Sequence, residues 1–369
     1  MKKKLYKFNQ SLDLEFTKTL RERVNEYFSE KNMSKYANGK MILKTIIMFA
    51  MFYVPYFVMI SGIISNIWIL FGMWMIMGVG MAGIGANVAH DALHGSYSRN
   101  KNVNKLLGFA MDIMGASGPM WKIQHNVLHH TFTNVEHVDD DIDTPLVLRF
   151  SPNKKWYKIH KYQHIYAWFF YSISTLYWVT VKNFVQVWNY WKRNQIKSKK
   201  NYRLEYLKLI GWKVFYFGYI IVIPMLLIPV APWLIILMFI SLQMVCGVVL
   251  STIFQPAHVN TAAEFIDQEE PEINHGRMAH QLLTTANFAP KNKLVSWFTG
   301  GLNFQIEHHL FPNICHIHYS KISEIVKQTA KEYNLPYYTQ ESFRKAIKDH
   351  VQFLKSLGRN EMVLSTMKS

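Results

Sequence analysis

The chain has 369 residues, of which 50% are hydrophobic, and it carries 41 Lys and Arg against 24 Asp and Glu. Its two cysteines, Cys246 and Cys315, are too few for a disulfide framework or a cysteine-type zinc site. The hydrophobic residues cluster into long runs flanked by basic segments, which is the pattern of a membrane protein. We therefore expect the excess positive charge to face anionic lipid headgroups, and we expect no nucleic acid as a partner.

The N-terminal segment, residues 1–40, is charged throughout, so no cleavable signal peptide is expected. Within it, residues 9–32 predict an amphipathic helix, because apolar residues from Leu12 to Phe28 recur at near-helical spacing among charges. We expect this helix to lie at the membrane surface on the cytoplasmic side.

A nearly chargeless stretch follows and is long enough for two membrane helices, at about 42–62 and 66–90, with a break near Ser61–Asn66. It contains Gly78-Val79-Gly80-Met81-Ala82-Gly83, which matches the dinucleotide-binding pattern. No strand precedes this match and its surroundings are apolar, so small residues that let two membrane helices approach closely are the better explanation.

Residues 91–164 are polar and rich in histidine, and residues 165–181 are apolar and aromatic. After the basic segment 182–208 come two more apolar runs, about 213–231 and 232–254, joined at a proline-containing turn. The predicted membrane domain spans 41–320, and 321–369 is predicted to be a cytoplasmic helical tail.

The run 165–181 decides the topology. If it crossed the membrane, the basic segment 182–208 would lie on the outer side, against the positive-inside tendency, and histidines before and after the run would be separated. We expect it to be interfacial or re-entrant. The prediction is an all-α integral membrane protein with four transmembrane helices in two hairpins, a cytoplasmic helical cap, and both termini cytoplasmic.

Three histidine clusters follow membrane spans: His90-Asp91-Ala92-Leu93-His94, His125-Asn126-Val127-Leu128-His129-His130 and Gln305-Ile306-Glu307-His308-His309. His258 lies where the last span ends. Helical positions i and i+4 share one face, and neutral imidazole is the commonest metal ligand, so this many histidines suits two ions better than one. Imidazole alone leaves Zn, Cu, Fe and Ni open. Six other histidines are expected to be surface or hydrogen-bonded residues (His137, His160, His164, His316, His318, His350), and His275 and His280 stay open.

The clusters resemble the three histidine boxes of the membrane fatty acid desaturases: His90-x-x-x-His94, His125-x-x-x-His129-His130 and Gln305-x-x-His308-His309, with Gly300-Gly301-Leu302-Asn303 and Leu310-Phe311-Pro312 around the third. The glutamine resembles the front-end branch, which includes delta-5, delta-6 and linoleoyl-CoA desaturases. The resemblance covers about residues 40–320.

This resemblance implies a cytoplasmic site with two non-haem Fe ions, O2 as co-substrate and a cis double bond introduced into an acyl-CoA or membrane lipid. It implies iron ligation by the box histidines and, by looser correspondence, by His258. Gln305 replaces a histidine of other branches, so its role stays open between ligand, water-mediated ligand and neither. No cytochrome b5 domain is recognisable, so electrons are expected from a separate donor such as ferredoxin or cytochrome b5.

Several polar residues near the boxes are candidates to orient ligand imidazoles. They are Asp91, Asn134 and the run Asp139-Asp140-Asp141-Ile142-Asp143, for which a solvated loop is the competing interpretation. Glu307 is expected either to orient an imidazole or to face water.

Two alternatives remain. A hydroxylase would use the same metal site to insert oxygen. A histidine-rich metal transporter is disfavoured, because such proteins bind ions near the bilayer midplane. We expect no charged residue in the predicted spans and no histidine in their interiors.

Overall fold

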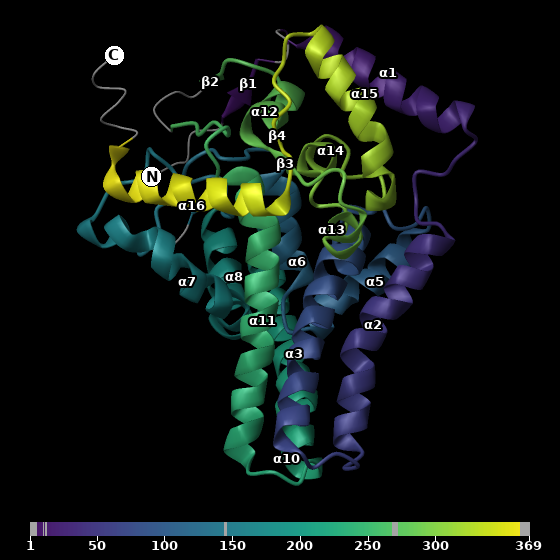
Figure 1. The fold of residues 1–369 in the computed structure, drawn as a ribbon, viewed down its shortest axis with the longest axis vertical. Helices are drawn as coiled ribbons and strands as arrows, with labels where there is room; N and C mark the ends of the chain where they lie inside the picture. The colour runs from purple at the N-terminus through teal and green to yellow at the C-terminus, as the bar shows by residue number, and fades with distance from the viewer. Residues whose placement is uncertain (1–5, 10, 12, 144–145, 268–271, 362–369) are drawn as a thin grey trace. The chain divides into compact units, whose positions relative to one another are not determined.

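The computed structural model describes residues 6–9, 11, 13–143, 146–267 and 272–361, and most of them are helical (Figure 1). Leu12 of the predicted N-terminal helix lies outside these residues. By their contacts the residues form two units. We call Asn38–Ile123 with Trp168–Ser251 the span unit, and Met1–Ala37 with Gln124–Ala167 and Thr252–Ser369 the polar unit.

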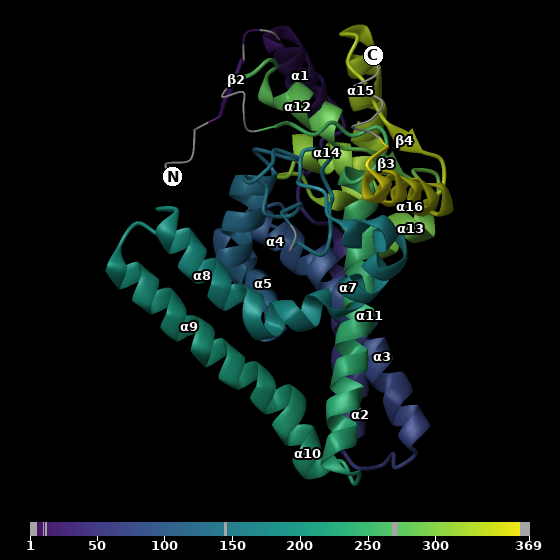
Figure 2. The same cartoon turned by 90° about the vertical axis from the view of Figure 1, so that its left-hand side faces the viewer.

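Among the described residues, four helices are long and apolar enough to cross a membrane: Gly39–Ile60, Ile67–His94, Lys199–Leu227 and Pro232–His258. This confirms the predicted number of spans, although the third helix begins well before the predicted residue 213. The first is α2 (Gly39–Ile60), and the second joins α3 (Ile67–Gly83), η1 (Ile84–Ala89) and α4 (His90–His94). The third joins α9 (Lys199–Phe217), η5 (Gly218–Val222) and α10 (Ile223–Leu227), which Figure 2 shows as one long helix, and the fourth is α11 (Pro232–His258).

Local sequence explains the first hairpin. The side chains of Asn38 and Asn66 accept hydrogen bonds from backbone N–H groups in the first turns of α2 and α3, which satisfies donors that a helix start leaves open. A Cβ added at Gly80 would lie 2.8 Å from the backbone nitrogen of Phe52, so glycine is what lets α3 approach α2. The close-packing interpretation of the glycine pattern is therefore confirmed.

Two lysines correct the expectation that the spans are free of charge. Lys44 of α2 and Lys213 of α9 lie within spans, and their side chains are buried. The ammonium group of Lys213 donates to the backbone carbonyl of Gly115 and to Oδ1 of Asn183, the latter at 3.1 Å. A mean hydropathy taken over a long segment does not reveal such residues, because one lysine barely changes the mean of an apolar run.

The rest of the span unit packs around these helices. It contains α5 (Lys101–Ile113), α6 (Gly118–Trp121), most of α7 (Gln163–Tyr177), η4 (Trp178–Lys182) and α8 (Asn183–Lys192). Thr175 of α7 donates to the carbonyl of Gln243 in α11 at 2.7 Å. α7 is not one of the four candidate spans, and its interfacial or re-entrant character stays a prediction.

The polar unit is made of short helices and, in its described residues, two parallel strand pairs. β1 (Lys7–Phe8) pairs with β2 (Glu272–Ile273), and β3 (Asn287–Phe288) pairs with β4 (Thr339–Gln340). The helices are α1 (Leu14–Glu30), η2 (Lys122–His129, mostly in this unit), η3 (Lys158–Tyr162), α12 (Arg277–Thr284), α13 (Lys293–Phe298), α14 (Gln305–Leu310), η6 (His316–His318), α15 (Tyr319–Glu332) and α16 (Phe343–Arg359).

Helix α1 corrects a second expectation. Its apolar face, which includes Phe16, Leu20 and Phe28, is buried in a cluster with Ile322 and Val326 of α15, and Figure 1 shows the two helices side by side. Protein therefore covers the stripe that we assigned to the membrane surface. An amphipathic pattern shows that a helix has a buried face, but it does not tell which apolar surface buries it.

Candidate metal centre

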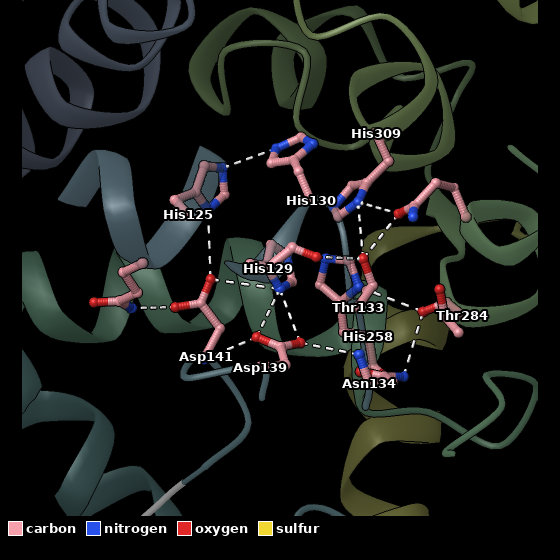
Figure 3. Close-up of polar contacts among 12 residues, drawn as sticks. His125, His129, His130, Thr133, Asn134, Asp139, Asp141, His258, Thr284 and His309 are labelled. Atoms are coloured by element: carbon pink, nitrogen blue, oxygen red, sulfur yellow. Dashed lines mark hydrogen bonds and ion pairs between the residues drawn. The ribbon is translucent and has the colours of Figure 1, made fainter. Parts of the chain in front are cut away.

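Six histidines from three distant segments meet in the polar unit, and Figure 3 shows His125, His129, His130, His258 and His309 of this group. His125, His129 and His130 come from η2 and its end, His258 is the last residue of α11, and His308 and His309 lie in α14. Each is at most 4% exposed. The second and third predicted boxes and His258 are therefore brought together.

The backbone of η2 explains how three histidines of one segment share one face. The N–H of His130 donates to the carbonyl of His125 at 2.9 Å, which is the i→i+5 bond of a π-helix. In an α-helix, at about 100° per residue, His130 would point about 140° away from His125. The π-helical turn brings residue i+5 back beside residue i, so His129 and His130 flank the direction of His125.

The ring nitrogens form sets with the spacing of metal ligands. In the set His129, His258 and His309, and again in the set His130, His308 and His309, nitrogens lie within 4.8 Å of one another. Nε2 of His130 lies 2.9 Å from Nε2 of His308. Two imidazole nitrogens facing each other at this distance need a proton or a cation between them, and a metal ion is what such sets commonly hold.

Carboxylates hold the opposite nitrogens of two of these rings. Both carboxylate oxygens of Asp139 lie 3.0 Å from Nδ1 of His129, and Asp141 lies 3.4 Å from Nδ1 of His125. Gln124 in turn donates to Asp141. The acidic run is thus not a plain solvated loop, since Asp139 is fully buried. Fixing Nδ1–H in this way leaves Nε2 as the lone-pair donor toward a metal.

The same carboxylates set the local electrostatics. Burial lowers the pKa of His129, but the negative charges of Asp139 and Asp141 outweigh it and raise that pKa to about 9. Burial, followed by the neighbouring rings of His130 and His258, holds the pKa of His309 well below its usual value. His309 therefore stays neutral, which is the form that binds a metal, and the negative pair beside His129 favours a cation.

His309 provides a direct test of fit. Its Nδ1–H donates to Oε1 of Gln281 at 2.8 Å, and Thr133 lies 3.3 Å from the same nitrogen. Its Nε2 is buried and has no hydrogen-bond partner in the part of the chain that the structure describes. A buried nitrogen lone pair left open toward other imidazoles costs free energy unless something binds it, so the residues present fit a metal ion.

Gln305 lies at the same place. Its Nε2 is 3.1 Å from Nε2 of His258, and its Oε1 is buried without a hydrogen-bond partner among the described residues. A rotation of the amide by 180° exchanges these two atoms and turns the oxygen toward Nε2 of His258. Gln305 therefore stands at ligand range of the site, and whether it binds a metal stays a proposal.

Two other predicted positions have structural partners. Asn134 donates from Nδ2 to the backbone carbonyls of His258 and Glu264 at 3.0 and 3.1 Å, so it holds the end of α11 rather than an imidazole ring. Glu307 neither faces water nor binds a ring, because it is fully buried and accepts hydrogen bonds from Asn287 and Tyr337. It fixes α14 against β3.

The first box lies in the span unit. The rings of His90 and His94 contact each other with centroids 4.7 Å apart, and each contacts the indole of Trp121 with centroids 5.5 Å apart. Asp91 is buried, and its Oδ1 lies 3.7 Å from Nδ1 of His90, which is longer than a hydrogen bond. The π-helical η1 ends immediately before His90, and such turns are frequent at functional sites.

Comparisons with known proteins identify the family. The family described as "Fatty acid desaturase" matches residues 66–341. The chain is 35% identical to the sn-1 linoleoyl-lipid 6-desaturase of a Synechocystis species, over 93% of this chain and 96% of that protein. The corresponding enzyme of Arthrospira platensis is 33% identical over 94% of this chain and 93% of its own length. The acyl-lipid (8-3)-desaturase of Physcomitrium patens is 32% identical over 98% of this chain and 76% of its own length.

The chain belongs to the fatty acid desaturase family. As a member it is an integral membrane oxidoreductase that introduces a double bond into a fatty acyl chain. The resemblance seen in the sequence is confirmed, and the membership decides against a metal transporter.

The span unit contains a small apolar cavity. A cavity of about 40 Å³ is lined almost entirely by apolar atoms, with Met81, Ala89, Ala116, Trp178 and Leu250 in its wall. Ala89 directly precedes His90, so the cavity reaches the turn that carries the first box. Gly85 also lines the cavity, and a Cβ added there would meet no atom within 4 Å.

The histidines expected to be structural mostly have such roles. His160, His318 and His350 bond to backbone carbonyls, and the side chain of His137 is 54% exposed. His280, left open, donates to the carbonyl of Thr133 at 2.8 Å and bonds to His275. Sequence reasoning missed Gln281, Thr133 and Tyr319, which contact His309 or His308. No spacing rule could find Gln281 and Thr133, since they lie 28 and 176 residues from His309, whereas Tyr319 follows His308 by 11 residues.

Proposed function

We propose that the protein is an oxygen-dependent di-iron desaturase of acyl lipids. His125, His129, His130, His258, His308 and His309 would hold the irons, with His90 and His94 completing the ligand set. Bound iron would supply, together with molecular oxygen, the oxidant that removes hydrogen from an unactivated methylene group. The observation that carries this proposal is the meeting of six buried histidines, whose ring nitrogens form sets within 4.8 Å of one another.

The protein's own residues would prepare this chemistry. Asp139 and Asp141 hold His129 and His125 in the tautomer that presents Nε2, and Gln281 does the same for His309. The small apolar cavity of the span unit would contact part of the acyl chain and exclude water near the reacting carbons.

The substrate proposal is an acyl group esterified to a membrane lipid, with the new double bond at position 6 of a linoleoyl chain. It is supported by two similar proteins that are named sn-1 linoleoyl-lipid 6-desaturases. We place the metal site and both termini on the cytoplasmic side, because the basic segment 182–208 then follows the positive-inside tendency. Electrons would come from a separate carrier protein.

Two experiments test this proposal. Expression in a host fed defined fatty acids, followed by mass spectrometry of its lipids, locates the double bond and separates desaturation from hydroxylation. A hydroxylated product without a new double bond would contradict the proposed reaction.

Metal analysis of the purified protein tests the site itself. We expect about two irons per chain in the wild type, and His308→Ala should lose both metal and activity. His164→Ala, at a histidine of α7 outside the cluster, is the matched control and should keep both. Normal turnover of His308→Ala would overturn the di-iron assignment.

A further inference from the structure

The outward face of α16 carries a stripe of basic residues. Arg344, Lys348, Gln352, Lys355 and Arg359 follow one another at steps of four, four, three and four residues, and all five are exposed. Steps of three and four keep side chains on one face of a helix. We call these five residues the α16 stripe. Four of them are cations, and none is acidic.

Few acidic groups neutralise the stripe. Glu361 pairs with Arg359 at 3.6 Å, and Glu341 pairs with Lys345, which lies beside the stripe. The carboxylate of Asp349 accepts a hydrogen bond from the hydroxyl group of Thr261 at 2.7 Å. Among the described residues, no carboxylate lies within ion-pair distance of Arg344, Lys348 or Lys355. These three charges are therefore available to a partner.

The other face of α16 decides what kind of partner fits. Ala346, Phe353, Leu354 and Leu357 are buried within the polar unit. The helix consequently has no apolar face left to insert into a bilayer, whereas interfacial membrane helices bind through such a face. A hydrophilic, cationic helix face of this type suits a water-soluble acidic protein.

The inward face of α16 touches the metal site's own segment. Nδ1–H of His350 donates to the carbonyl of Val259 at 2.7 Å, and Ala346 packs in one cluster with Ala257. Those two positions flank His258, which lies in the histidine cluster. One helix, about 10 Å thick, therefore separates a partner on the α16 stripe from the segment that carries His258.

We propose that the α16 stripe is the docking surface for an acidic electron-carrier protein of the ferredoxin or cytochrome b5 class. This inference rests on the proposed function. Conversion of one –CH2–CH2– unit into –CH=CH– with one O2 consumes two electrons and two protons and yields two waters. The acidic carrier is the source of the two electrons, and because such carriers deliver one at a time, each turnover requires docking twice.

The test is the double charge reversal Lys348→Glu/Lys355→Glu in the full-length protein, reconstituted in zwitterionic nanodiscs. Neither lysine has an ion pair to lose, so folding should be unaffected. The first readout is the double bond formed per chain in a single turnover, after anaerobic reduction with dithionite and methyl viologen and then addition of oxygen. This readout needs no carrier. The second readout is kcat/KM for reduced ferredoxin and for reduced cytochrome b5, at low and high ionic strength.

We expect an unchanged single-turnover yield and a kcat/KM for the carrier that falls about tenfold at low salt, with a weaker salt dependence than in the wild type. Lys321→Glu/Lys327→Glu on α15 is the matched control, since both lysines are exposed and also lack ion pairs in the described structure. It should leave kcat/KM nearly unchanged.

Several results would overturn the proposal. They are an unaltered kcat/KM in the α16 variant, an equal loss in the α15 control, and carriers that fail to support turnover although the chemical reductant does. A loss confined to discs containing anionic lipid would show that the stripe binds lipid instead. If the wild type forms no product even in the chemically reduced single turnover, the proposed function itself fails, and the docking proposal fails with it.

Discussion

Asp139→Asn is the substitution that tests the orientation of the metal site most directly. Asp139 is fully buried, and its two oxygens contact Nδ1 of His129 at 3.0 Å. They also accept the backbone N–H groups of Asn134 and Asp141, both at 2.9 Å. Asparagine keeps the shape and one acceptor oxygen. It loses the negative charge, and its NH2 group cannot accept either backbone N–H.

The expected effect follows from these contacts. Removing a carboxylate that orients a ligand histidine typically weakens metal affinity about 10–100-fold. At about 1.4 kcal/mol per tenfold change, this corresponds to roughly 1.4–2.8 kcal/mol of binding free energy. We expect the variant to lose iron in competition with a chromogenic chelator at concentrations that leave the wild type loaded. Desaturation, measured by mass spectrometry of the lipid product, should fall with the iron content.

Asp143→Asn provides the control within the same acidic run. Asp143 is exposed and pairs with Lys154 only at 3.7 Å, so its removal should change metal binding little, as surface ion pairs contribute about 0–1 kcal/mol. If Asp139→Asn retained iron as firmly as Asp143→Asn, the carboxylate would not be what holds His129 toward the metal.

Three further outcomes are expected. Gly85→Leu should fill the cavity of the span unit and lower the desaturation rate about tenfold for the longest acyl chain that the wild type accepts, while the rate for short chains stays unchanged. Gly218→Leu is the control. A Gly85→Leu rate that is lowered equally for all chain lengths would contradict the role of the cavity. Gln305→Ala should lose iron whereas Gln305→His should retain it, and metal analysis of the two variants decides whether this position acts as a ligand. Burial lowers the pKa of His350 to about 4, so that, as the pH falls, this histidine is protonated in the unfolded chain before it is protonated in the folded protein. The contribution of neutral His350 to the free energy of unfolding should therefore be fully present above about pH 6.5 and fall by about 3 kcal/mol as the pH approaches 4. Thermal unfolding of His350→Gln should show a correspondingly smaller loss of stability over this pH range. Identical pH profiles of the wild type and the variant would refute this prediction.

The membrane architecture could be predicted because it depends on composition over long windows. Four spans, the break after α2 and the proline turn before α11 all follow from apolar runs and their interruptions. Single charges such as Lys213 do not register in such windows. Its burial depends on acceptors at Gly115 and Asn183, which are far away in the sequence.

The candidate metal centre was predictable to the extent that its histidines occur as spaced pairs. The i, i+4 rule identified His125 and His129, but it assumes an α-helix, and only the π-helical bond from His130 to His125 explains why the third histidine joins them. The residues that hold the rings lie in several different segments. Asp139 was foreseeable because it follows its partner closely, whereas Gln281 was not.

The supporting groups also differ in chemistry, and this difference has a consequence. His125 and His129 have carboxylates at Nδ1, His309 has an amide oxygen, and His308 lies 3.3 Å from the phenol of Tyr319. A carboxylate raises the basicity of a ligand imidazole more than a neutral acceptor does. Among the proposed ligands, the imidazoles beside the acidic run are therefore more basic than those of α14. Two metal ions bound there would occupy unlike environments, although the proposed ligands of the polar unit other than Gln305 are all histidines.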